Sequence, residues 1–421
     1  MTDITGPRQL ATQARALAAV CCAVALAGTG PLTGACEILA AWDGPADVRG
    51  AAPRTLTDPA NGGRTRQEPT LHVVLRMAAA LTALALAGGV AVTAAAGAPP
   101  ASATTCRHIA GPFHTSGGAV YTASGRRFIP YGINLTPLSS TGLAHLEAEE
   151  DAAASGWCAN LVRFGTDQDA MIKGGKVNRA YLSEVETVAA HARADGLDVA
   201  LVMFSTRPGP ALPVWRTEAA WRALAYHYRT DTAHVIFDIY NEPTGDWPIW
   251  RNGGMAGGTR RYGMEQLARY IRAQGARNLL WVEGHMRGGN LYGIPQYHLT
   301  GVGPVMYSEH RPPAPHTPAS WWASFASVSR HWPVVEGEWA NYDRANATWA
   351  CWADGRVTVG RFLTYLADHR IGLVAYDLVQ PRMLESASLT DPNHIRADWQ
   401  CVSGLNEGAG SQIMHWFALH N

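Results

Sequence analysis

The sequence predicts an α/β fold, a single (β/α)8 barrel of the TIM-barrel type that follows an N-terminal leader. Eight short apolar segments recur between residues 128 and 378, and helical patterns lie between them. Eight strands that alternate with helices over about 250 residues are typical of this barrel. The segments are apolar along almost their whole length, as expected for parallel strands buried on both faces. The same pattern leaves a doubly wound sheet open as an alternative.

The expected strands alternate with the expected helices along the chain. The strands are Phe128–Asn134, Ala159–Phe164, Asp198–Phe204, Val235–Tyr240, Leu279–Glu283, Val305–Ser308, Val334–Glu338 and Leu373–Leu378. The helices are Ala144–Ala154, Tyr181–Ala194, Glu218–Tyr228, Met264–Gln274, Ala319–Ser327 and Val359–His369. Before the first strand, Gly118–Arg127 predicts a hairpin with its turn at Ser124-Gly125, because this dipeptide favours turns.

The N-terminal region contains no pattern of a folded domain before residue 73. We expect residues 1–72 to be disordered, or to be an upstream extension that is not part of the natural product. Residues 73–103 predict a signal peptide, because Arg76 precedes a long Ala-rich apolar stretch that ends at Ala101-Ser102-Ala103. The barrel domain is therefore expected at residues 104–421 of a secreted protein. A membrane anchor formed by an uncleaved signal is the alternative.

Four cysteines follow the predicted cleavage site, at Cys106, Cys158, Cys351 and Cys401. An even number of cysteines in an exported chain predicts two disulfides. Three connectivities are possible, and we favour Cys106–Cys158 with Cys351–Cys401, which would tie each end of the domain to its body. Four buried free thiols are the alternative. No C-x-x-C pair is present, which argues against a zinc site.

The composition restricts the possible functions. Formal net charge is zero, with 34 basic and 34 acidic residues, which argues against nucleic acid as a partner. Fifteen tryptophans fit both core packing and stacking on sugar rings. No cluster has metal-ligand spacing and no phosphate-binding loop is present, so we expect neither a metal nor a cofactor. We expect a monomer.

Two carboxylates lie where the chemistry of a barrel belongs, at the C-terminal ends of strands. The fourth expected strand runs into Asn241-Glu242-Pro243, and the seventh ends at Glu338. Strands four and seven face each other across the barrel mouth, which suits two carboxylates flanking a glycosidic bond. Glu336 is the rival for the role of Glu338, because it has the same strand parity, but it lies deeper in the barrel. Glu283 and His285 also end a strand, and no motif assigns them a role.

The segment Ala220–Pro243 resembles glycoside hydrolase family 5, the cellulase and mannanase family, and the resemblance extends over Gly118–Leu384. It implies that Glu242 is the acid/base and that Glu338 is the nucleophile. It also implies that Arg163, at the end of the second strand, holds the nucleophile.

The resemblance implies three supporting residues as well, and the chemistry of the reaction suggests Asn241 as a fourth. His310 corresponds to the family's histidine near the acid/base, and Asn134 ends a Gly-Ile-Asn that is similar to the family's Gly-Val-Asn. Asn241 is expected to donate a hydrogen bond to the sugar 2-hydroxyl, an interaction that strengthens in the transition state. Tyr376 stands where the family has a tryptophan platform.

Two positions depart from the family pattern. Ser205 stands where the third strand of the family ends in histidine, and Pro312 stands where a tyrosine normally follows the strand-six histidine. We therefore expect the shape of the sugar site to differ from the family pattern.

These observations together predict a secreted retaining glycoside hydrolase, similar to an endoglucanase or mannanase. It would cleave a β-linked glucan or mannan by double displacement, with two glutamates roughly 5–5.5 Å apart. A polysaccharide or oligosaccharide is therefore the expected partner. A carbohydrate-binding barrel without activity, or a transglycosylase that uses the same site, is the alternative.

Overall fold

The computed structural model describes residues 106, 108–207, 211–310, 315–341, 343–345, 348–350, 355–378, 399–400, 406–407 and 409–421. The predicted signal peptide, the segment before it and the predicted Cys351–Cys401 pair lie outside these residues. In the part of the chain so described, no helix has the length and apolar character needed to cross a membrane.

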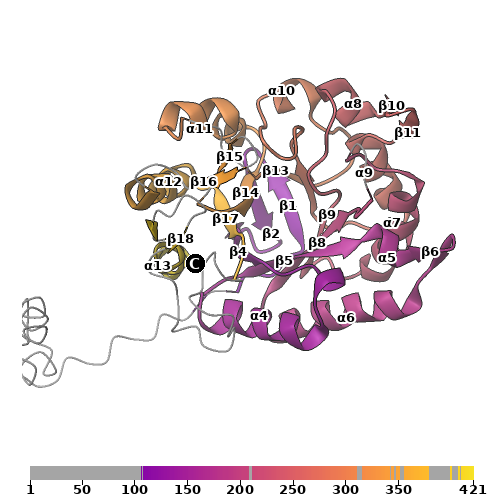
Figure 1. Ribbon diagram of the computed structural model, residues 1–421, viewed down its shortest axis with the longest axis horizontal. Helices are drawn as coiled ribbons and strands as arrows, with labels where there is room; N and C mark the ends of the chain where they lie inside the picture. The colour runs from indigo at the N-terminus through magenta and orange to yellow at the C-terminus, as the bar shows by residue number, and fades with distance from the viewer. Residues whose placement is uncertain are drawn as a thin grey trace, which may run out of the picture. The chain divides into compact units, whose positions relative to one another are not determined.

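Eight parallel strands form a closed barrel, as the sequence predicts (Figure 1). In chain order they are β4 (Tyr131–Asn134), β5 (Leu161–Asp167), β8 (Asp198–Phe204), β9 (Val235–Asp238), β12 (Leu280–Glu283), β13 (Val305–Glu309), β14 (Val334–Trp339) and β17 (Gly372–Ala375). The last strand pairs with the first, with Leu373 opposite Tyr131. This closure excludes the doubly wound sheet.

Helices alternate with the barrel strands, and all six expected helices are present. They are α4 (Leu143–Ser155), α6 (Arg179–Ala194), α7 (Trp215–Tyr228), α9 (Met264–Ala273), α11 (Pro318–Ser324) and α12 (Gly355–His369). The described residues also form helices that the sequence pattern does not indicate, which are η2 (Leu138–Ser140), α5 (Gln168–Met171), α8 (Trp247–Asn252), α10 (Ile294–Tyr297), η3 (Ala326–Arg330) and α13 (Gly410–His420). Most of them are a single turn, too short to show a helical period.

Within the described ranges, four small hairpins lie in the connections between barrel strands and helices. They are β6–β7 (Ile172–Lys173, Lys176–Val177), β10–β11 (Gly254–Ala256, Thr259–Arg261), β15–β16 (Asp343–Ala345, Thr348–Ala350) and β18–β19 (Trp399–Gln400, Asn406–Glu407). Of these, β10–β11 follows α8 in the connection between β9 and α9, which is a connection on the C-terminal side of the barrel.

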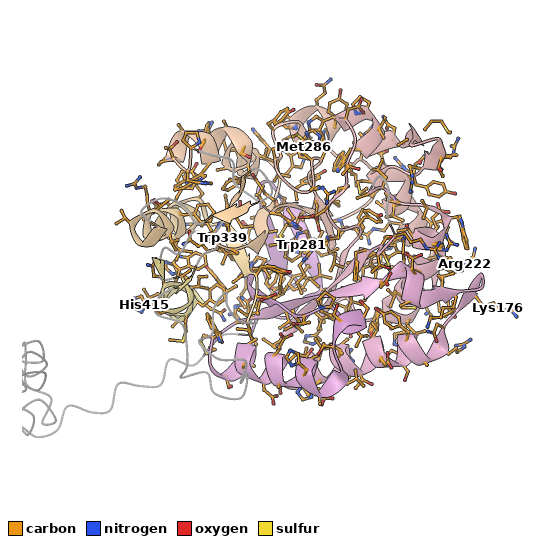
Figure 2. All side chains as sticks on the ribbon, viewed as in Figure 1. Lys176, Arg222, Trp281, Met286, Trp339 and His415 are labelled. Atoms are coloured by element: carbon orange, nitrogen blue, oxygen red, sulfur yellow. A yellow bond between two sulfur atoms is a disulfide. The ribbon has the colours of Figure 1, made fainter. Side chains whose placement is uncertain are left out.

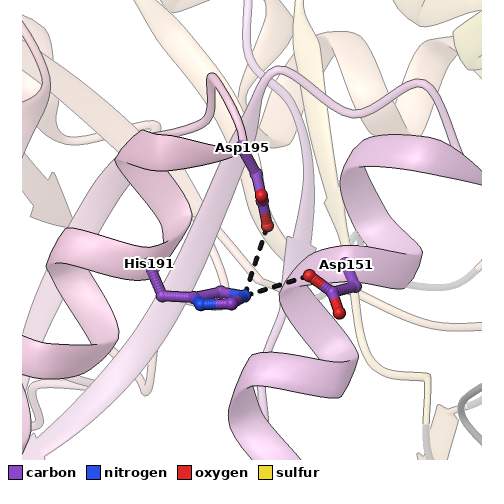
Figure 3. Close-up of side chains that lie close together, drawn as sticks. All are labelled: Asp151, His191 and Asp195. Atoms are coloured by element: carbon purple, nitrogen blue, oxygen red, sulfur yellow. Dashed lines mark hydrogen bonds and ion pairs between the residues drawn. The ribbon is translucent and has the colours of Figure 1, made fainter.

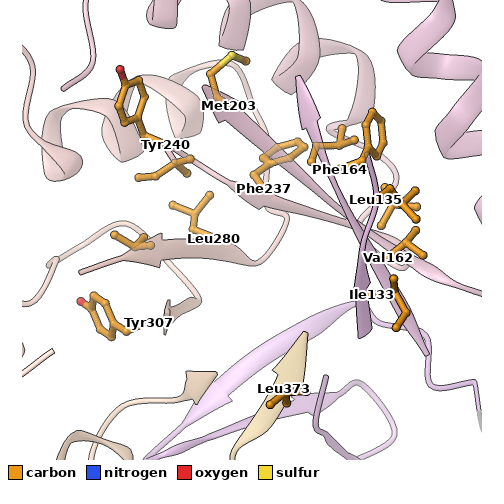
Figure 4. Close-up of a cluster of buried hydrophobic side chains, with 14 of the residues drawn as sticks. Ile133, Leu135, Val162, Phe164, Met203, Phe237, Tyr240, Leu280, Tyr307 and Leu373 are labelled. Atoms are coloured by element: carbon orange, nitrogen blue, oxygen red, sulfur yellow. The ribbon is translucent and has the colours of Figure 1, made fainter. Parts of the chain in front are cut away.

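Alternation along the strands divides the core into two layers. Ile133, Val162 and Phe237 belong to the large cluster between the strands and the helices (Figure 4). Leu161 and Trp281 belong to the smaller cluster inside the barrel, and Trp281 lies near the centre of the molecule in Figure 2. Because side chains alternate along a strand, every second residue after an interior apolar one also points inward. The interior positions at the strand ends are therefore available for polar side chains.

A three-stranded sheet closes the N-terminal end of the barrel. It contains β1 (Phe113–Ser116), β2 (Ala119–Thr122) and β3 (Arg127–Phe128), and Phe113, Val120 and Phe128 pack in the interior cluster. Val120 pairs with Phe128, which confirms the predicted hairpin, and Gly125 in its turn has a φ of 80°. With this end covered, the opposite end of the barrel is left for a functional site.

The predicted disulfide Cys106–Cys158 is formed, with Cα atoms 5.2 Å apart. It ties the start of the domain to the connection that follows α4. Asn421 at the other end of the chain donates from Nδ2 to the carbonyl oxygen of Cys158 at 2.7 Å.

The covering sheet should contribute strongly to stability through Phe128, which is 2% exposed. We expect Phe128→Ala to lower the free energy of unfolding by about 3–5 kcal/mol, because it removes a buried ring and leaves a cavity. Chemical denaturation measures this change. As a control, Tyr226→Ala removes a ring that is 59% exposed and should cost less than about 1 kcal/mol. Equal costs for the two variants would contradict the covering role.

Candidate active site

One buried arginine organises the C-terminal end of the barrel. Arg163 points inward from β5 and is 3% exposed. Its Nε, Nη1 and Nη2 donate to Asp238 Oδ2 (2.8 Å), Asn134 Oδ1 (2.7 Å), Glu338 Oε2 (3.1 Å), Asn241 Oδ1 (2.7 Å) and Glu283 Oε1 (2.8 Å). A guanidinium has five N–H donors, so each of them has an acceptor. The partners come from four other strands or the residues just after them, and Arg163 fixes their positions relative to one another.

The acids around Arg163 are balanced by a second cation, His310. Its ring is fully buried, and Nε2 lies 3.3 Å from Glu283 Oε1. Burial lowers the pKa of this histidine, but the charge of Glu283 and contacts with Glu242 and Glu338 raise it to about 10. His310 is therefore protonated at neutral pH. Burial and the neighbouring Glu283 raise the pKa of Asp238 to about 8, against the opposing effect of Arg163.

Glu242 follows β9 and has an unusual backbone. Its φ is 46°, in the left-handed region that residues other than glycine rarely adopt. Its N–H donates to Glu283 Oε2 at 2.5 Å, which helps to hold this conformation. Strained backbone of this kind is common at functional sites, where the surrounding structure holds it in place.

The two predicted catalytic glutamates lie together. His310 Nδ1 is 3.8 Å from Glu242 Oε1 and 3.7 Å from Glu338 Oε2. A carboxylate oxygen of one glutamate lies within 4.8 Å of one from the other. Their side chains are 13% and 18% exposed, whereas those of Arg163, Asp238 and Glu283 are at most 3% exposed. Of these five groups, only the two glutamates are accessible to a substrate.

Glu336 lies on the other face of β14, so the parity argument that placed it beside Glu338 is wrong. Glu336 is opposite Glu309 on β13, and Ser324 of α11 donates to Glu309 Oε1 at 2.6 Å, so this pair faces the helices. Between Glu336 and Trp339 the register with β17 shifts at a bulge. The bulge breaks the alternation and lets Glu338 reach Arg163.

The Glu309 and Glu336 carboxyl groups are fully buried side by side. Burial raises the pKa of both well above the usual range, and the proximity of Glu309 adds to the effect on Glu336. A protonated Glu336 in this position would be a poor nucleophile.

The two predicted asparagines also lie at this end of the barrel. Asn134 Nδ2 donates to the carbonyl oxygens of Gly337 (3.1 Å) and Val374 (3.2 Å), so it connects β4 to β14 and β17. Asn241 Oδ1 is taken by Arg163, which leaves the amide nitrogen of Asn241 as its donor toward a substrate.

The contacts of the other positions that the sequence singled out, such as Tyr376 and Ser205, lie outside the hydrogen bonds of Arg163. Tyr376 directly follows β17, where its N–H donates to Trp339 O at 2.8 Å, and its side chain is half-buried. Ser205 donates to Asp169 Oδ2 at 2.8 Å. Pro312 lies outside the described residues. His285 packs on Trp247, with ring centroids 4.3 Å apart.

Among the residues that the structure describes, two groups of side chains are close enough to hold a cation. One is Glu242, His310 and Glu338, but a protonated His310 cannot donate a lone pair to a metal. The other group is Asp151, His191 and Asp195, between α4 and α6 (Figure 3). There His191 Nε2 already lies 3.0 Å from Asp151 Oδ1 and 3.5 Å from Asp195 Oδ2, so these side chains connect the two helices.

Sequence reasoning did not assign roles to Asp238 and Glu283, the two buried acids of the site. Asp238 interrupts an apolar strand, four residues before Glu242, and Glu283 ends the next strand. A carboxylate in an apolar barrel strand at an inward position is the signal that would have identified both.

Comparisons with known proteins agree with this architecture. A family model for cellulase (glycosyl hydrolase family 5) matches residues 125–380. β-Glucanase SdGluc5_26A from Saccharophagus degradans, solved with cellotetraose, aligns with a TM-score of 0.55 and 14% identity over 77% of this chain and 97% of that chain. The catalytic domain of an endoglucanase from Thermobifida fusca, also with cellotetraose, aligns with a TM-score of 0.55 and 15% identity over 73% and 97%. No curated protein sequence matches the chain.

The charge of His310 should depend on Glu283. We expect Glu283→Gln to lower the pKa of His310 from about 10, because Glu283 is the largest charge that favours the protonated ring. A raised pKa of this kind stabilises the fold at neutral pH, and the contribution is lost as pH rises through about 10. NMR of the imidazole nitrogens measures the titration. The variant Glu184→Gln, at an exposed position of α6, should leave it unchanged, and an unchanged titration in Glu283→Gln would refute the coupling.

Proposed function

Because the chain belongs to glycosyl hydrolase family 5 and is thereby a glycoside hydrolase, we propose that it cleaves β-linked glucan with retention of configuration. The observation that carries this proposal is the pair of accessible glutamates, Glu242 and Glu338, whose oxygens approach within 4.8 Å. Retaining enzymes hold the two carboxyl groups roughly 5–5.5 Å apart, whereas inverting enzymes need about 6.5–9.5 Å for a water molecule. The short separation favours direct attack by one carboxylate.

Glu338 acts as the nucleophile in this proposal. Arg163 Nη1 donates to Glu338 Oε2 at 3.1 Å, and His310 Nδ1 lies 3.7 Å from the same oxygen, so the carboxylate is held in place by two neighbouring side chains. Glu338 attacks the anomeric carbon, and a covalent glycosyl-enzyme forms as the leaving oxygen departs.

Glu242 acts as the acid and then as the base. With Glu338 ionised nearby, a second negative charge is unfavourable, so Glu242 holds its proton until the leaving oxygen takes it. Glu242 then removes a proton from the water that hydrolyses the intermediate. Asn241 donates to the sugar 2-hydroxyl during both steps.

The proposal also includes the localisation of the enzyme, its domain organisation and the first substrate to test. The predicted signal peptide at residues 73–103 supports a secreted enzyme, and the chain after it forms the catalytic domain. Inactivity is not favoured, because Arg163 donates to Glu338 and an oxygen of Glu242 lies within 4.8 Å of one of Glu338. The cellotetraose in the two solved structures favours a glucan over a mannan as the first substrate to test.

Removing the nucleophile should abolish hydrolysis. We expect Glu338→Gln to lower kcat on mixed-linkage β-glucan by at least about 10³-fold, because no other carboxylate can form the intermediate. Glu336→Gln is the matched control, two residues away on the opposite face, and should keep kcat/KM within about threefold. Reducing-sugar release measures both. The reverse result would make Glu336 the nucleophile.

Removing the acid should depend on the leaving group. We expect Glu242→Gln to lower kcat on the polymer by about 10²–10⁴-fold. On dinitrophenyl β-cellobioside the first step should fall by less than about tenfold, because this leaving group departs without a proton. Burst-phase kinetics separate the two steps.

NMR of the first product should show the β-anomer, and an initial α-anomer would overturn retention.

A further inference from the structure

A cavity of about 560 Å³ opens beside Glu242. Its walls come from the segment after β8, from Asn241 and Glu242, from β11 with the residue after it, and from the loop after β12. Glu338 is not among the lining residues. The acid protonates the oxygen of the leaving group, so a cavity on its side, away from the nucleophile, is placed to receive the leaving part of the substrate.

The charge of this cavity is strongly one-sided. Five arginines line it, which are Arg207, Arg216, Arg260, Arg261 and Arg287. Glu242 is the only carboxylate among the lining residues, and in the proposed mechanism it is protonated when substrate binds. Five guanidinium groups therefore surround this cavity, although the formal net charge of the chain is zero.

Neighbouring acids compensate only part of this charge. Asp169 lies 2.5 Å from Arg207 Nε and 3.8 Å from Arg216 Nε, so one carboxylate is shared between two arginines. Arg287 Nη1 reaches only as far as Glu242 Oε2, at 3.8 Å.

Among the described residues, no carboxylate compensates Arg260 or Arg261 in this way. Within the segments that the structure describes, neither forms an ion pair with a carboxylate, and Arg261 Nε is buried without a hydrogen-bond acceptor. A buried guanidinium N–H that lacks an acceptor is costly, and a bound anion would remove the cost.

The hairpin that carries these two arginines is held in place. Tyr262 N–H donates to Pro213 O at 2.9 Å, which joins the end of β11 to the opposite wall. A Cβ at Gly263 would lie 2.3 Å from Arg251 O, so only glycine fits there. The arginines are therefore presented by a fixed backbone.

Aromatic faces accompany the charges. Trp215 is 48% exposed, and the guanidinium of Arg216 lies 4.5 Å from its ring centroid. Phe204, Tyr240 and Tyr262 also line the cavity. Flat apolar faces suit sugar rings, whereas planar guanidinium groups suit an oxyanion.

We propose that this cavity binds a negatively charged substituent on the leaving-group side of the scissile bond, with Arg260 and Arg261 as its principal ligands. The inference rests on the proposed function, and it narrows the substrate class from neutral β-glucan to β-glucan or a related polymer that bears oxyanions. The shared chemistry is a carboxylate, sulfate or phosphate oxyanion, which a guanidinium binds through paired N–H donors.

The test compares carboxymethyl cellulose, which is anionic, with hydroxyethyl cellulose, which is neutral, at matched substitution. We expect the wild type to show a higher kcat/KM on the anionic polymer, and Arg260→Gln/Arg261→Gln to lower the ratio between the two polymers by about tenfold. Added salt should lower the ratio for the wild type, because it screens exposed charges. Cellulose sulfate and phosphorylated cellulose, used as further arms, distinguish the oxyanions.

The control removes the same charge elsewhere. Arg179 and Arg222 are exposed and do not line the cavity, and Arg222 lies at the edge of the molecule in Figure 2. Arg179→Gln/Arg222→Gln should keep the wild-type ratio. A ratio that falls equally in both double variants, or in neither, overturns the inference.

Binding without turnover separates this inference from the proposed function. Retardation in native gels that contain each polymer should show stronger binding of the wild type to the anionic polymers, and loss of that difference in Arg260→Gln/Arg261→Gln. Single Arg260→Gln, an exposed position, serves if the double variant does not fold. Retardation without hydrolysis would refute the glucanase and support the anion site. Hydrolysis of neutral polymer without arginine-dependent retardation would do the opposite.

Discussion

The rest of the site depends on one constraint, which is that every N–H donor of the buried Arg163 guanidinium needs a hydrogen-bond acceptor. A buried guanidinium is tolerated only when its donors are satisfied, and here all five N–H groups have acceptors between 2.7 and 3.1 Å away. Those acceptors include Glu338, the proposed nucleophile, and Asn241, the proposed donor to the sugar. They also include Glu283, which accepts a hydrogen bond from the backbone of Glu242. Moving any one of them would leave a buried charge or a buried N–H without a partner. The hydrogen bonds that satisfy the buried guanidinium therefore also set the geometry of the site.

The buried groups divide into support and reaction. Glu283 holds the arginine, the Glu242 backbone and the histidine at once, yet a substrate cannot reach it. Glu242 and Glu338 lie at the edge of this cluster, where they are partly exposed. The buried charged cluster beneath the two accessible carboxyl groups is held by its own hydrogen bonds. Little reorganisation is therefore needed when charge develops in the transition state.

The sequence predicted the barrel well, because strand burial imposes a pattern that is local. Glu242, Glu338, Arg163 and His310 were found through strand ends and a family motif, and the structure brings them together. The assignment of faces on β14 could not be made from alternation, since a bulge next to Glu338 depends on pairing with β17. The arginine cavity was also missed. Its five arginines are spread from position 207 to 287, and only the folded connections bring them to one place.

The closure of the barrel through Asn134 links assembly of the site to contacts between residues that are far apart in the chain. Asn134 in β4 bonds to Val374, 240 positions later, and to Arg163 from the neighbouring strand. Contacts between such distant residues form against a large loop entropy, and folding is slower where they dominate. Until β17 pairs with β4, Asn134 lacks the carbonyl oxygens that fix its amide, and one acceptor of the guanidinium is not held. We therefore expect partly folded chains to have no ordered active site even when most strands have formed, so that recovery of activity would report barrel closure during refolding.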